Sequence, residues 1–102
     1  MNDISVQELH QRILNGDRIT LIDVREVYEH EEFNIGGELA PLQSELPLKI
    51  GAMHGLEEEE IIVYCRSGNR SQMAKMMFEQ SGFKNVRNLL GGMNSWKENI
   101  TV

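Results

Sequence analysis

The sequence predicts an α/β domain in which helices cover both faces of a central, mainly parallel β-sheet. Two observations predict this class: apolar segments of strand length alternate with segments of helical pattern, and the segment Ile61–Tyr64 is apolar at every position. A strand that is apolar throughout is typical of the covered centre of a parallel sheet. The length of 102 residues is that of one domain, so we expect a single domain over residues 1–102.

The first half of the chain contains the patterns of two helices and two strands. A capping box that starts at Ser5 predicts a helix that ends at Gly16. Residues 19–24 are almost continuously apolar and predict a strand. The polar residues 25–33 predict a short helix, and residues 39–40 a short strand.

The second half repeats the alternation. Ser44 is expected to cap a helix that carries Pro47 in its first turn, where proline is tolerated. The central strand over 61–64 follows, and then a helix over 70–80 whose buried side is expected to include Met73. The last predicted elements are a strand over 86–90, a Gly-Gly turn and a helix over 93–98.

Composition and charge exclude several classes of protein. With 16 acidic and 10 basic residues the chain has a net charge of −6 and no basic stripe, which argues against nucleic-acid binding. The longest apolar run, residues 61–65, is far shorter than the roughly 20 residues that span a membrane. The only cysteine, Cys65, excludes an internal disulfide and suits a reducing compartment. Because no signal peptide is visible either, we expect a cytoplasmic protein.

The chemistry is expected in the loop Cys65–Arg70, which joins the central strand to the following helix. A short loop at a helix N-terminus directs backbone N–H groups inward, and Gly68 permits the left-handed conformation that such a loop needs. A thiol at its centre would ionise readily, with Arg66 and Arg70 within reach. Taken from the residues alone, a lone cysteine at a strand end is also common as a small core residue.

This loop, together with the following Ser71, resembles the active-site loop of the rhodanese family of sulfurtransferases. The segment Asp23-Val24-Arg25 resembles an early Asp-x-Arg motif of that family, and Leu90-Gly91-Gly92-Met93 with Trp96 resembles its C-terminal Gly-Gly turn and tryptophan. The resemblance extends from about residue 4 to residue 98, and it implies a rhodanese-like three-layer α/β/α domain. One segment departs from the family pattern: Asn34–Glu38 lacks the usual histidine and proline.

The resemblance also implies a mechanism. The Cys65 thiolate would attack the outer sulfur of a donor such as thiosulfate, and a thiophilic acceptor would then remove that sulfur from the resulting persulfide. Arg66 is expected to meet the anionic donor, and Arg70 to anchor the loop against Asp23 or Glu26. The residues expected to bind substrate are Arg66, Ser67, Gly68, Asn69 and Arg70, with Asp23 and Arg25 in support.

No cofactor or metal is expected. His10, His30 and His54 are scattered in the sequence without metal-ligand spacing and are interpreted as surface residues. The predicted partners are a small anionic sulfur donor and a thiophilic acceptor, which includes an acceptor protein, and no nucleic acid or membrane. A small domain with one accessible thiol predicts a monomer.

Two alternatives stay open at this point. The first is a non-enzymatic persulfide carrier or thiol sensor, which would dock through the acidic residues 26–32 and 57–60. The second is a cysteine-dependent phosphatase or arsenate reductase, although loops of that kind are one residue longer than the spacing from Cys65 to Arg70. Comparing steady-state turnover of thiosulfate with stoichiometric persulfide loading separates the carrier from the enzyme.

Overall fold

A computed structural model describes residues 2–100. The predicted domain over residues 1–102 also includes Met1, Thr101 and Val102, which lie outside the described residues. Helices and strands alternate along the chain as predicted. The elements are α1 (Val6–Leu14), β1 (Thr20–Asp23), α2 (Val27–Glu32), β2 (Glu38–Leu39), α3 (Leu46–Ala52), β3 (Ile61–Tyr64), α4 (Asn69–Gln80), β4 (Val86–Asn88) and α5 (Gly92–Asn99).

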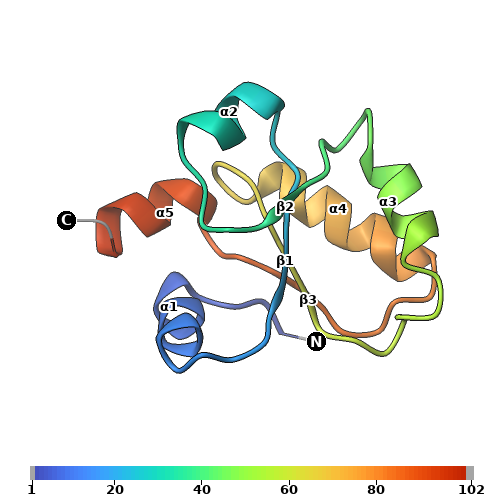
Figure 1. Cartoon of the computed structure of the whole chain (residues 1–102), viewed down its shortest axis with the longest axis horizontal. Coiled ribbons are helices and arrows are strands. Elements are labelled where there is room, and N and C mark those ends of the chain that lie inside the picture. The colour runs from blue at the N-terminus through green and yellow to red at the C-terminus, as the bar shows by residue number, and fades with distance from the viewer. Residues whose placement is uncertain (1, 101–102) are drawn as a thin grey trace.

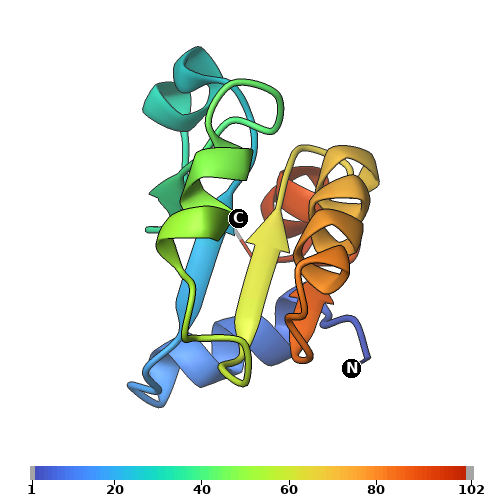
Figure 2. The ribbon, with the colours of Figure 1, turned by 90° about the vertical axis from the view of Figure 1, so that its right-hand side faces the viewer.

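The four strands form one parallel sheet in the order β2-β1-β3-β4. Figure 1 views this sheet nearly on edge, with α1 and α5 on one face and α3 and α4 on the other, while α2 lies at the end where the strands finish. In Figure 2, turned by a quarter, α3 lies in front of β1, and β3 is visible between α3 and α4. The predicted three-layer α/β/α architecture is confirmed.

The central strand β3 carries both halves of the core because its side chains alternate between the two faces of the sheet. Ile61 and Val63 belong to the core under α3 and α4, and Cys65 continues their alternation. Ile62 and Tyr64 belong to the core under α1 and α5. The pleat of β3 therefore places Cys65 on the α4 side, at the edge where the helix begins.

Two details of the helices differ from the predictions. Ser44 does not cap α3: the turn that begins at Pro41 carries the chain one residue further, and Glu45 takes the N-cap position. Met73 is not on the buried side of α4 but is 57% exposed, because the helix turns Ala74 and Phe78 toward the sheet.

Smaller differences concern the ends of elements. The Ser5 hydroxyl caps α1 as predicted, accepting the Glu8 N–H at 3.1 Å, while the Glu8 carboxylate pairs with Arg87 of β4. The short second strand begins and ends one residue earlier than predicted.

Over residues 2–100, none of the helices has the length and apolar character that crossing a membrane requires.

Candidate active site

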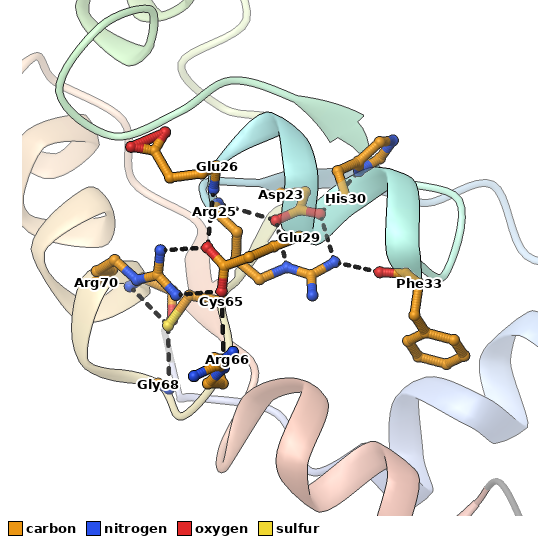
Figure 3. Close-up of polar contacts among 11 residues, drawn as sticks. Asp23, Arg25, Glu26, Glu29, His30, Phe33, Cys65, Arg66, Gly68 and Arg70 are labelled. Atoms are coloured by element: carbon orange, nitrogen blue, oxygen red, sulfur yellow. Dashed lines mark hydrogen bonds and ion pairs between the residues drawn. The ribbon is translucent and has the colours of Figure 1, made fainter.

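The loop after β3 encloses the sulfur of Cys65. Gly68 adopts a left-handed conformation with φ of 105°, which a residue with a side chain rarely takes, and this turn starts α4 at Asn69. The Gly68 N–H donates to Cys65 Sγ at 3.1 Å (Figure 3). The Ser71 N–H donates to the same sulfur at 3.4 Å. The Ser71 hydroxyl oxygen lies 3.3 Å from the same sulfur. The loop thus brings two helix-terminal N–H groups and one hydroxyl to one atom.

These contacts favour the anionic form of the sulfur. Burial of Cys65, which is only 1% exposed, raises the pKa of its thiol, but the hydrogen bonds from Ser71, Gly68 and Ser67 lower it further than burial raises it. The net direction is a pKa below the ordinary value of a cysteine. Cys65 is buried. The prediction of a monomer assumed an accessible thiol, and in this respect it is not supported.

We expect the pKa of the Cys65 thiol to lie below that of a free cysteine. The rate of alkylation by iodoacetamide, measured against pH on the single thiol, should show a midpoint below about 8.5, the value of a free cysteine. Unfolded protein in urea is the matched control and should titrate near that value. A folded-state midpoint at or above the control contradicts the expected effect of the loop on the sulfur.

Arg70 is held by a carboxylate that the sequence analysis did not single out. Two of its guanidinium nitrogens donate to the two carboxylate oxygens of Glu29 in α2, at 2.8 and 3.0 Å (Figure 3). The predicted anchors, Asp23 and Glu26, are therefore wrong. Glu29 is only 5% exposed, and the hydrogen bonds from Arg70 lower its pKa to about 2.

Arg66 lies on the open side of the loop. Its side chain is 65% exposed, and its Nε atom is 3.7 Å from the second oxygen of Glu29. It also lines a small polar hollow of about 40 Å³ together with Asn94 and Lys97 of α5. The two arginines are thus inequivalent, since the side chain of Arg70 is engaged in a bidentate pair while that of Arg66 remains largely solvated.

Asp23 and Arg25 hold α2 in place from the end of β1. The fully buried Asp23 carboxylate accepts the Arg25 N–H at 3.0 Å and two guanidinium nitrogens at 3.0 and 2.8 Å. Burial raises the pKa of Asp23, but the bonds from Arg25 and His30 lower it below its usual range. Arg25 also donates to the Phe33 carbonyl just after α2. This pair supports the site indirectly, by positioning the helix that presents Glu29.

His30 is not the simple surface residue that was predicted. Its Nδ1 atom lies 2.8 Å from Asp23 Oδ2, and its side chain is half-buried against that carboxylate. No three metal-ligating side chains come together anywhere in residues 2–100.

The residues that follow the Gly-Gly turn donate hydrogen bonds to the backbone of the Cys65 loop. The Met93 N–H donates to the Cys65 carbonyl, and the Asn94 N–H donates to the Arg66 carbonyl, both at 2.9 Å. A Cβ atom on Gly92 would clash with the Cys65 carbonyl and come within 2.7 Å of the Arg66 carbonyl oxygen. Only a glycine at this position lets α5 approach the loop closely enough for these two hydrogen bonds.

The remaining predicted residues lie at the rim. Ser67 is at the exposed tip of the loop, and its backbone N–H is one of the groups that lower the Cys65 pKa. Asn69 is exposed at the start of α4.

Two residues of the site, Glu29 and Asn88, were not predicted from the sequence. Asn88 comes three residues before the Gly-Gly turn and donates from its side chain to the Gly68 carbonyl at 3.1 Å. The only signal for it was a polar residue inside a predicted strand.

Comparisons with known proteins agree on one family. The family model of the rhodanese-like domain matches residues 5–99. A putative sulfurtransferase of Bacillus subtilis is 32% identical over 97 residues, which cover 95% of this chain and 91% of that protein. A putative sulfur carrier protein of the same organism is 32% identical over 94 residues, or 92% of this chain, but this chain spans only half of its length.

Solved structures with the same fold include proteins of similar size. A rhodanese-like domain protein of Staphylococcus aureus superposes with a TM-score of 0.83 at 26% identity, covering 94% of this chain and 91% of that one. A human single-domain sulfurtransferase gives a TM-score of 0.80 at 27% identity, covering 95% and 96%.

Proposed function

This chain belongs to the rhodanese-like domain family, and we propose that it transfers a sulfane sulfur through a persulfide on Cys65. The observation that carries the proposal is the convergence of the Gly68 N–H, the Ser71 N–H and the Ser71 hydroxyl on Sγ. Such a set of donors stabilises negative charge on the nucleophile and on the outer sulfur that it acquires. Relatives named as a sulfurtransferase and as a sulfur carrier support the same chemistry.

The proposed first step uses thiosulfate as the donor. The Cys65 thiolate attacks the outer sulfur of thiosulfate, the new S–S bond forms as the old one breaks, and sulfite leaves with the electron pair. The persulfide left on Cys65 carries the negative charge. In the second step a thiophilic nucleophile such as cyanide attacks the outer sulfur, and the Cys65 thiolate is the leaving group, which restores the starting state.

Loading of the protein with thiosulfate tests this proposal. After incubation and removal of excess donor, mass spectrometry should find one added sulfur atom per chain on the peptide that contains Cys65. Cyanide should remove that atom and release one equivalent of thiocyanate. Protein alkylated beforehand is the control and should gain no sulfur. If the native protein gains no sulfur although its thiol still reacts with iodoacetamide under the same conditions, the result contradicts the proposal.

A carrier role is the second candidate, and one observation favours it: Cys65 is buried, which keeps its own sulfur away from bulk solvent. A relative is also named as a sulfur carrier. The acidic surface predicted for docking is partly engaged within the chain, since Glu29 binds Arg70 and Glu60 binds Arg12 and Arg87. Stoichiometric loading without steady-state turnover of thiosulfate and cyanide identifies the carrier.

The phosphatase alternative is disfavoured by the position of Arg70. Such an enzyme needs a guanidinium directed at the bound oxyanion, because a bidentate pair with its oxygens positions the group. Here the guanidinium is directed at Glu29 in that manner. The site therefore supports sulfur transfer better than phosphoryl transfer.

Replacing Arg66 by alanine should raise the KM for thiosulfate a few-fold with little change in kcat. An exposed charge contact contributes about 0.2–1 kcal/mol, and this one is made to the donor before chemistry. Lysine at 66 should recover part of the affinity, because a point charge is sufficient to attract an anion. The control is Arg18→Ala, which removes an exposed arginine before β1, at the opposite end of the sheet. Equal KM values for the two alanine variants contradict this role.

A further inference from the structure

Asn88 connects β4 to the loop around Cys65 through side-chain contacts that the reaction above does not use. The residue is 5% exposed. Its amide nitrogen donates to the Gly68 carbonyl at 3.1 Å and to Gln72 Oε1 at 3.3 Å. With the nitrogen directed at these two acceptors, the amide oxygen faces the Ser71 hydroxyl oxygen at 2.5 Å. Because an amide oxygen only accepts hydrogen bonds, Ser71 is the donor.

The Ser71 hydroxyl therefore has two acceptors and one proton. Its oxygen lies 2.5 Å from Asn88 Oδ1 and 3.3 Å from Cys65 Sγ. While the sulfur is a neutral thiol, the hydroxyl donates to Asn88, and its oxygen can accept the weak S–H donor. When the sulfur is anionic, the hydroxyl gains more by donating to the sulfur, because a hydrogen bond to an ionised acceptor is roughly twice as strong as one to a neutral acceptor.

We propose that Asn88 is a positioning residue that holds the Ser71 hydroxyl proton while the Cys65 sulfur is neutral and releases it when that sulfur becomes an anion. Asn88 itself lies behind Ser71 and acts on the sulfur through that hydroxyl. The anion is the thiolate in the free protein and, resting on the proposed function, the persulfide after loading. Asn88 thereby opposes ionisation of Cys65, since the hydroxyl must leave a good acceptor before it turns to the sulfur.

The charged groups around the site are separate from this pair. Arg66 and Arg70 lie beside the sulfur with Glu29 of α2 behind them. On the other side of Asn88, the Asp3 carboxylate accepts the Asn88 backbone N–H and also pairs with Lys75 of α4. These groups keep their partners when the Asn88 side chain is removed, so an effect of that change on the sulfur comes from neutral hydrogen bonds.

Asn88→Ala tests the proposal by the sign of its effect. Without the competing amide oxygen, the Ser71 hydroxyl donates to the sulfur alone, and the pKa of Cys65 should fall by about half a pH unit. The rate of iodoacetamide alkylation at a pH below the midpoint should then rise about threefold. If Asn88 only supports the loop, its removal loosens the N–H groups around the sulfur, and the pKa rises instead. A rise overturns the proposal.

Two further variants test whether the effect of Asn88 on the pKa of Cys65 passes through the Ser71 hydroxyl. In a Ser71→Ala background, Asn88→Ala should no longer lower the pKa, because the hydroxyl that transmits the effect is absent. Gln72→Ala removes the other, exposed side-chain partner of the Asn88 amide nitrogen and should leave the pKa unchanged. A decrease that persists without Ser71, or that Gln72→Ala reproduces, overturns the proposal.

Asn88→Asp keeps the shape of the side chain, and it tests the same proposal if the alanine variant does not fold. Its carboxylate is a stronger acceptor for the Ser71 hydroxyl, so the pKa of Cys65 should rise, and by less in the Ser71→Ala background. An equal rise in both backgrounds overturns the proposal. Alkylation reads the thiol directly and needs no sulfur transfer, so these results stay distinct from the outcome of the persulfide-loading experiment.

Discussion

Cys65→Ser is expected to lower kcat/KM for sulfur transfer from thiosulfate by at least about 1,000-fold while the fold is retained. The serine hydroxyl is a far weaker nucleophile at neutral pH than a thiolate, and it cannot form a persulfide. Oxygen is smaller than sulfur but accepts hydrogen bonds, so the donors from Gly68 and Ser71 keep a partner in the buried loop. Thiocyanate production under steady-state conditions measures the loss.

The fold of this variant is checked by the fluorescence of the buried Trp96 and by urea unfolding. The free energy of unfolding should change by less than about 1.5 kcal/mol, as expected for a small change in volume at a site whose hydrogen bonds persist. Cys65→Ala is a second variant that also removes the hydroxyl. Sulfur transfer at the native rate by either folded variant contradicts the assignment of Cys65 as the nucleophile.

Arg70→Ala is expected to destabilise the protein by about 2 kcal/mol, because it leaves the buried Glu29 carboxylate without its bidentate partner and with only the more distant Arg66 beside it. The value lies below the 3–5 kcal/mol typical of fully buried pairs, since the Arg70 side chain is 36% exposed. Arg70→Lys should recover little, because an ammonium does not reproduce two parallel hydrogen bonds. Urea unfolding at pH 7 measures both.

The matched control is Lys84→Ala. Lys84 pairs with Glu58 at 3.2 Å, but both side chains are exposed, so its loss should cost less than about 1 kcal/mol. Equal destabilisation by Arg70→Ala and Lys84→Ala contradicts the anchoring role. Arg66→Ala, by contrast, should affect the donor KM and hardly the stability.

The same ion pair sets part of the acid stability. Glu29 has a pKa of about 2 in the folded chain, below its ordinary value of 4.5, so its contribution to stability is present above pH 4.5 and is lost as the pH falls toward 2. This difference between the two pKa values of Glu29 corresponds to a contribution of about 3 kcal/mol to the free energy of unfolding. Glu29→Gln cannot titrate and should show a shallower fall in the free energy of unfolding between pH 5 and pH 2.5. Parallel profiles contradict this linkage.

The local patterns of the sequence determine the elements and their order. The alternation of apolar and helical segments, the uniformly apolar β3 and the Ser5 cap each depend on residues within a few positions of one another, so they can be recognised without knowing the fold. The same holds for the loop from Cys65 to Arg70, because a left-handed glycine and a helix N-terminus are local features. The three-layer arrangement then follows from the rules that govern parallel sheets.

The partners of the polar side chains were decided by the tertiary structure. Arg70 meets Glu29 across 41 positions of the chain, and Asn88 meets Ser71 across 17, and no local pattern distinguishes these partners from other acids and amides. His30 lies against Asp23 and Met73 faces solvent because of the way α2 and α4 are set on the sheet. Hydrophobic periodicity determines which face of an element is buried, whereas hydrogen bonds and ion pairs depend on where two separate elements bring individual atoms together.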